Sequence, residues 1–171
     1  MLQIKTATDA TNQQNTTMNN TIQVSLSRIN TEFNDLALPA YATSGSAGMD
    51  VYAAVEQPLV IPHGGIMLVP TSLAIALPVG YECQVRSRSG LAAKNGVFCL
   101  NSPGTIDSDY RGEIKVILAN VGGSDFTIHR GDRIAQLVVA KHETVQWNVV
   151  DTLDETDRGE GGFGSTGVKH T

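Results

Sequence analysis

The chain of 171 residues lacks the features that identify membrane, disulfide-linked and zinc proteins. Its only cysteines, Cys83 and Cys99, form no CxxC pair, and its four histidines show no metal-ligand spacing. No apolar run approaches the ~20 residues that span a bilayer, and the N-terminus lacks the basic-then-apolar order of a secretory signal. We therefore expect a soluble cytoplasmic protein with no membrane partner, in which both cysteines are structural.

Basic residues are also scarce, because 12 lysines and arginines stand against 17 aspartates and glutamates, for a net charge of −5. This balance excludes the broad basic face of a nucleic-acid-binding domain, so no nucleic-acid partner is expected. If the substrate is a polyanion, its charge must be met locally by a few arginines, by oriented backbone amides and by a bound cation.

Composition divides the chain into three parts. Residues 1–21 are rich in Thr, Asn and Gln and are expected to be a disordered N-terminal extension. Residues 22–154 carry the short apolar segments of one folded domain. Residues 155–171 are Gly-rich and fit either a solvated linker or a flexible arm that closes over a flat anionic ligand.

The domain shows many short strand patterns and no long helical period, which predicts an all-β sandwich or jelly roll. The predicted strands are 22–29, 66–69, 73–77, 81–86, 97–100, 113–118, 126–128 and 133–139. One short helix is expected, with Ser89 as its N-cap, good helix formers at 91–94 and Asn95-Gly96 as its stop.

Three segments carry residues suited to phosphate chemistry. The segment RSRSG at 86–90 runs into the start of the helix, where free amides favour an anion, although a capped helix with exposed arginines is the alternative. The segment GTIDSDYRGEI at 104–114 places three carboxylates and a tyrosine around a predicted hairpin, or forms an ordinary solvated turn. Asp50 stands between a loop and a strand, where it either faces a cation or closes a turn.

Together these segments resemble the five motifs of the homotrimeric dUTPase family, in the family's order and at closely similar spacing. The resemblance covers about residues 22–167, and the one small departure is Ser87, where many family members carry proline. The five matching segments are AGMDVYAA at 47–54, RSGLA at 88–92, GTIDSDYRGEI at 104–114, RGDRIAQL at 130–137 and RGEGGFGSTG at 158–167.

The resemblance implies a jelly-roll-like β-barrel or sandwich that forms a homotrimer and hydrolyses dUTP to dUMP and pyrophosphate. That reaction limits uracil incorporation into DNA and supplies dUMP for thymidylate synthesis. Asp107 is implied as the general base that activates the attacking water. Asp50 is implied to bind Mg²⁺ through water, while the metal bridges the phosphates.

The resemblance also implies the residues that bind the substrate. Uracil is expected at Asn101, Thr105, Ile106 and Lys115, with the ring of Tyr110 against the deoxyribose. The expected phosphate-binding residues are Arg88, Ser89, Gly90, Gln136, Arg158, Ser165 and Thr166. Phe163 is expected to stack on the base, with the C-terminal arm reaching the site of another chain.

Two other functions remain open at this point. A dCTP deaminase would share a related fold, and a non-catalytic nucleotide-binding module would keep the trimer without the reaction. The complete third and fifth motifs favour the hydrolase over the deaminase, and the presence of Asp107 together with the full tail argues against the non-catalytic module.

Overall fold

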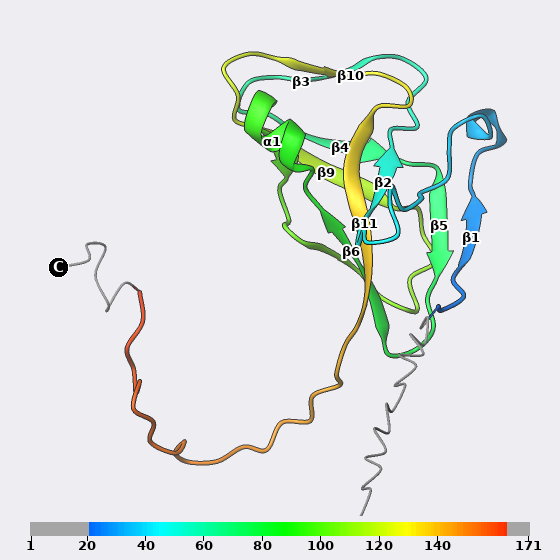
Figure 1. Ribbon diagram of the computed structural model, residues 1–171. Helices are drawn as coiled ribbons and strands as arrows, with labels where there is room; N and C mark the ends of the chain where they lie inside the picture. The colour runs from blue at the N-terminus through cyan, green and yellow to red at the C-terminus, as the bar shows by residue number, and fades with distance from the viewer. Residues whose placement is uncertain (1–20, 164–171) are drawn as a thin grey trace, which may run out of the picture.

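The computed structural model describes residues 21–163, which form eleven strands, one α-helix and one 3-10 helix (Figure 1). The strands are β1 (Ser25–Arg28), β2 (Met49–Tyr52), β3 (Leu59–Ile61), β4 (Ile66–Pro70), β5 (Leu73–Ala76), β6 (Tyr81–Arg86), β7 (Val97–Cys99), β8 (Gly104–Ile106), β9 (Lys115–Asn120), β10 (Phe126–Ile128) and β11 (Arg133–Lys141). The helices are η1 (Thr31–Phe33) and α1 (Ser89–Asn95). None of the described helices is long and apolar enough to cross a lipid bilayer.

The strands are arranged in four antiparallel sheets. The largest has the order β2-β11-β6-β8, and a second has the order β4-β9-β7. The pairs β1-β5 and β3-β10 complete the described strands. Figure 1 shows β11 crossing in front of β4 and β9, so the two larger sheets lie in different layers.

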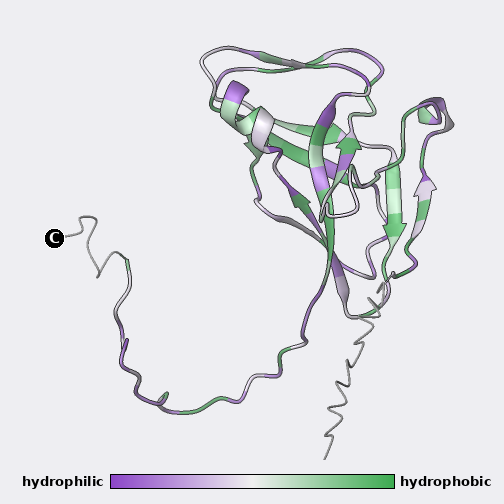
Figure 2. Cartoon of the chain, viewed as in Figure 1, coloured by the Kyte–Doolittle hydropathy of each residue, from purple (hydrophilic) through white to green (hydrophobic). Residues whose placement is uncertain are grey.

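Side chains from these layers form one apolar core. Val51, Leu118 and Ile128 are fully buried, and the core continues through residues of nearly every strand. Burying each such side chain stabilises the fold by roughly 1.5–3 kcal/mol, relative to leaving it in water. Figure 2 shows this as hydrophobic colour on the packed strands. The predicted all-β class is confirmed.

The eight predicted strand segments all contain strands, but their ends differ and three strands were not in that set. The first strand covers only Ser25–Arg28, and the strand predicted from residue 113 begins at Lys115. The strands β3 and β8 have three residues each, too few to show alternation, and β3 lies between two prolines. Pairing with β10 and β6, respectively, makes these two segments strands.

The helix is present, but its predicted N-cap is wrong. Arg88 is the N-cap, with extended backbone and no side-chain cap bond, and Ser89 is the first helical residue. Gly96 ends the helix as predicted, in the left-handed region at φ 67°. A Cβ at Gly96 would lie 2.5 Å from the backbone nitrogen of Gly122, so close packing also favours glycine there.

Candidate functional site

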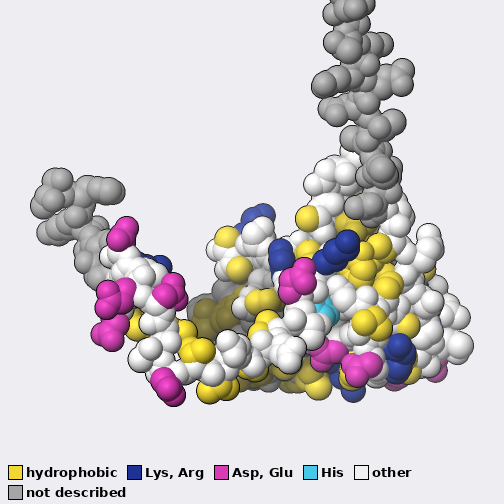
Figure 3. All heavy atoms as spheres, turned by 90° about the horizontal axis from the view of Figure 1, so that it is seen from below, with side chains coloured by type: hydrophobic (Ala, Val, Ile, Leu, Met, Phe, Trp, Pro, Cys, Tyr) yellow, Lys and Arg dark blue, Asp and Glu magenta, His cyan; other side chains and the backbone are white. Residues whose placement is uncertain are grey.

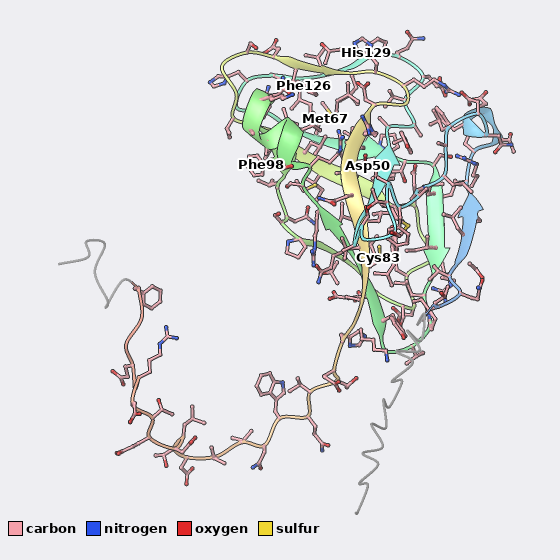
Figure 4. The ribbon with its side chains drawn as sticks, viewed as in Figure 1. Asp50, Met67, Cys83, Phe98, Phe126 and His129 are labelled. Atoms are coloured by element: carbon pink, nitrogen blue, oxygen red, sulfur yellow. The ribbon has the colours of Figure 1, made fainter. Side chains whose placement is uncertain are left out.

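Asp50 lies on β2 at the centre of a charged cluster (Figure 4). Its carboxylate accepts a hydrogen bond of 2.9 Å from Nε of Arg88 and one of 3.3 Å from a guanidinium nitrogen of Arg133. Arg88 also donates to the carbonyl of Arg133 at 2.8 Å. Two guanidinium groups around one carboxylate leave an excess of positive charge, which suits an anionic ligand.

Strand pairing explains why these residues meet. β11 pairs with β2 on one side and with β6 on the other, so Gln136 lies opposite both Asp50 and Arg86. The amide of Gln136 donates to the carbonyl of Ser87 at 3.0 Å, which holds the chain just before α1. Segments of the first, second and fourth motifs therefore converge around β11.

Glycine at position 48 leaves room for this convergence. A Cβ there would lie 2.4 Å from Oε1 of Gln136, so any larger residue would displace that side chain. A cavity of about 380 Å³ remains beside it, bordered by Asp50, Arg86 and Gln136. The first turn of α1, with Ser89 and Gly90, starts directly after Arg88 and has no side-chain cap over its amides. These groups are suited to bind phosphate.

The third-motif segment is not a paired hairpin, which corrects the sequence prediction. Its first arm is β8, which pairs with β6, and its second arm leads into β9, which pairs with β4 and β7. The two arms belong to different sheets, because each finds its hydrogen-bond partners elsewhere. A cavity of about 320 Å³ lies where a ladder between them would have been.

Six of the residues expected to bind or act on the substrate line this cavity, together with Glu113, and it is called the base cavity because uracil is expected there. They are Asn101, Thr105, Ile106, Asp107, Tyr110 and Lys115. Asp107 is exposed, immediately after β8, and its carbonyl accepts a hydrogen bond of 3.2 Å from the backbone nitrogen of Tyr110. Backbone N–H and C=O groups that border the cavity between the separated arms can hydrogen-bond the edge of a nucleobase, in the way that they would bond an added strand.

The base cavity and the charged cluster lie at different edges of the β2-β11-β6-β8 sheet, because β8 borders the cavity and β2 carries Asp50. Side chains alternate along a strand and match across a pair, so Asp50, Arg86 and Gln136 share one face. Val85 and Ile106, which line the base cavity, are buried on the other face. Thr105, which also lines the cavity, lies opposite Gln84 and therefore on the face of Asp50, so the strand order rather than the two faces separates the groups.

The C-terminal segment leaves the domain after β11. Residues 142–163 form no helix or strand, and Figure 1 shows them running away from the sheets. Arg158 donates to the carbonyl of Gly161 at 2.8 Å, and Phe163 is exposed, so neither lies in the base cavity of its own chain. Ser165 and Thr166 lie outside the described residues.

This segment is both apolar and acidic (Figure 3). Trp147 is 86% exposed and Val149 92% exposed, although such side chains are usually covered. The acidic side chains of the segment are also exposed: Glu143, Asp151, Asp154, Glu155, Asp157 and Glu160.

The residues present fit a magnesium ion that takes most of its ligands from water and from the substrate. Within residues 21–163 no group of three or more His, Cys, Asp or Glu side chains is placed to hold a metal ion. A Mg²⁺ bound by phosphates needs only one or two protein carboxylates. Asp50 fits contact through water, because both of its oxygens already accept hydrogen bonds from arginines.

Sequence reasoning did not assign a role to Arg133. It lies in the fourth motif, three positions before Gln136, where a turn entering a strand seemed to explain it. The available signal was a second arginine in a charged motif of a chain poor in basic residues. Its contact with Asp50, 83 residues away in the chain, became visible only in the folded structure.

Comparison with known proteins agrees with this geometry. The model of the dUTPase family matches residues 34–167. A deoxyuridine 5'-triphosphate nucleotidohydrolase of Orientia tsutsugamushi (strain Ikeda) is 61% identical over 133 residues, which is 78% of this chain and 90% of that protein. A protein of the same name from Rickettsia bellii (strain OSU 85-389) is 63% identical over 131 residues, or 77% of this chain and 87% of that protein.

A solved structure, the dUTPase of Staphylococcus bacteriophage 80alpha with dUPNHPP, has a TM-score of 0.76 to this chain at 24% identity. The match covers 86% of this chain and all of that one, and confirms the predicted jelly-roll-like fold. With a family model over most of its length and relatives at about 60% identity, this chain belongs to the dUTPase family.

Proposed function

We propose that the chain catalyses the reaction of its family at the cavity and cluster described above. dUTP is hydrolysed to dUMP and pyrophosphate. The base cavity is the observation that assigns this reaction to particular residues, because six residues expected from the sequence to form the site line this one cavity.

Uracil and deoxyribose bind in the base cavity. Asn101, the backbone of Thr105 and Ile106, and the start of β9 at Lys115 supply hydrogen-bonding groups for the base edge. A site built to hydrogen-bond one base edge rejects a mismatched edge by about 10⁴–10⁵, because its polar groups would be left unpaired. The ring of Tyr110 packs against the sugar where a 2'-hydroxyl would stand.

The phosphates bind at the charged cluster. Arg88 supplies charge, Ser89 and Gly90 supply a hydroxyl and backbone amides at the start of α1, and Gln136 adds a polar contact. Arg133 shares Asp50 with Arg88, so Arg88 can turn toward a phosphate while Asp50 keeps a cationic partner.

Asp107 accepts a proton from the water that attacks the α-phosphorus, and pyrophosphate leaves in line with that attack. A bound Mg²⁺ supplies charge neutralisation and orientation of the triphosphate, with Asp50 contacting its water shell. The fifth motif completes the site: Phe163 stacks on the base, while Arg158, Ser165 and Thr166 contact the γ-phosphate. Closure of this segment excludes water other than the nucleophile.

The site is assembled from different chains of a homotrimer. One chain holds the base cavity beside β8 and Asp50 on β2, at opposite edges of a sheet, which supports a neighbour's cluster completing the cavity. The tail also leaves its own domain and exposes Trp147 and Val149. If the tail packs against another chain of the trimer, it leaves its own domain and these two side chains are covered by that chain.

Pyrophosphate release from dUTP, with dCTP and UTP as controls, tests the proposed reaction. We expect turnover of dUTP alone, abolished by EDTA and restored by Mg²⁺. Conversion of dCTP to a uracil nucleotide, followed by absorbance, would indicate a deaminase instead. Binding of dUTP without turnover would indicate a non-catalytic module. Location in the cytoplasm stays a prediction from the sequence.

A further inference from the structure

The second arm of the third-motif segment is tied to the turn between β4 and β5. The backbone nitrogen of Ile114 donates to the carbonyl of Leu73 at 2.8 Å, and the hydroxyl of Thr71 donates to the carbonyl of Ile114 at 2.6 Å. Between these bonds, the backbone nitrogen of Ser72 donates to Oε1 of Glu113 at 2.8 Å. One wall of the base cavity is therefore held through residues that lie 41 to 43 positions earlier in the chain.

Ser72 makes this contact from an uncommon backbone conformation. It is 2% exposed and has φ 57°, in the left-handed region that residues other than glycine rarely adopt. Its hydroxyl is within hydrogen-bonding distance of both backbone polar groups of Asn30, at 3.0 and 3.3 Å. These bonds keep its N–H directed at the Glu113 carboxylate.

Glu113 is in turn joined to Tyr110. The tyrosine hydroxyl donates to the carbonyl of Glu113 at 3.0 Å, and the ring crosses over Gly112. A Cβ at Gly112 would lie 2.4 Å from that hydroxyl oxygen, so the crossing requires glycine. The tyrosine ring is thus fixed from within its own loop, by an acceptor whose position depends on Ser72.

We propose that Glu113 is a positioning residue that fixes the ring of Tyr110 against the deoxyribose and so sets the preference for dUTP over UTP. This inference rests on the proposed placement of the sugar at Tyr110. The Glu113 side chain is only 20% exposed, and it borders both the base cavity and a second cavity of about 400 Å³ beside Ser72 and Asn30. Glu113 acts through the length of its side chain and its hydrogen bond to Ser72. Its charge contributes little, because the ion pair with Lys115 is 3.5 Å long and Lys115 is half exposed.

The test compares kcat/KM for dUTP and for UTP in a set of variants. Glu113→Ala should lower the dUTP:UTP ratio by roughly 10- to 100-fold, because a misplaced contact of about 1 Å has effects of this size. Glu113→Gln keeps the reach and an acceptor oxygen, so it should retain the ratio. Glu113→Asp keeps the charge but is one methylene shorter, so it should lose the ratio. Glu56→Ala, an exposed acid beside the second cavity, is the matched control.

Two further measurements separate this inference from a general loss of structure and from a wrong sugar site. Thermal unfolding identifies variants that fail to fold, and Glu113→Gln keeps the test valid if Glu113→Ala does not fold. Tyr110→Ala should lower the ratio; an unchanged ratio would overturn the sugar placement and this inference with it. A third outcome would contradict the positioning role: Tyr110→Ala lowers the dUTP:UTP ratio, Glu113→Gln lowers it as well, and Glu113→Asp leaves it unchanged. The charge of residue 113, and not the length of its side chain, would then set the ratio.

Discussion

At the scale of single residues, Asp107 stands directly after β8 on the border of the base cavity, where a carboxylate can reach a bound substrate. Asp107→Asn should keep dUTP binding and lower kcat by roughly 10²–10⁴-fold, because the amide keeps the shape and cannot accept the proton. Pyrophosphate release and calorimetric titration with a non-hydrolysable dUTP analogue measure the two effects. Asp109→Asn, two residues away in the same exposed turn, is the matched control, and a near-normal kcat in Asp107→Asn would remove Asp107 from its role.

Cys83 and Cys99 belong to the same scale, as buried free thiols. Burial raises the pKa of Cys83 from 9.0 to about 11 and also raises the pKa of Cys99. A pKa raised by folding gives a contribution to stability that is present below pH 9 and is lost as the pH rises toward 11. Both thiols should therefore resist a disulfide reagent at pH 8 in the native protein and react in urea. Rapid labelling of the native protein would show that the strands around β6 open readily.

At the scale of elements, β11 and the segment that follows it have different tasks. Pairing with β2 and β6 makes β11 part of the domain, whereas residues 142–163 form no helix or strand. Truncation after Asp154 should leave a folded trimer that still binds dUMP and turns over dUTP poorly, because the removed residues are proposed to contact the base face and the γ-phosphate. Light scattering, dUMP titration and pyrophosphate release give the three readouts. Loss of the trimer would show that the removed residues are a structural element.

At the scale of the whole molecule, the separation of base cavity and charged cluster predicts activity from mixtures of inactive chains. Asp107→Asn chains refolded together with Arg88→Ala chains should regain turnover, because some trimers will join an intact cavity to a neighbour's intact cluster. Asp107→Asn chains mixed with chains truncated after Asp154 test the tail in the same way. Native mass spectrometry must first show mixed trimers. If these form and either mixture stays as inactive as its parents, the corresponding part of the site belongs to a single chain.

The sequence by itself determined eight of the eleven described strands, the helix with its stop at Gly96 and the identity of the motifs, because these depend on neighbouring residues. The resemblance to the family motifs also named Asp107, Tyr110 and Asn101 as site residues before any fold was known, and all three line the base cavity. Only the tertiary structure decided that the third-motif arms separate, because their partners lie on β6, β4 and β7. It also decided that Arg133 shares Asp50 with Arg88 and that Ser72 holds Glu113, since hydrogen bonds between distant residues depend on strand order and register rather than on local pattern.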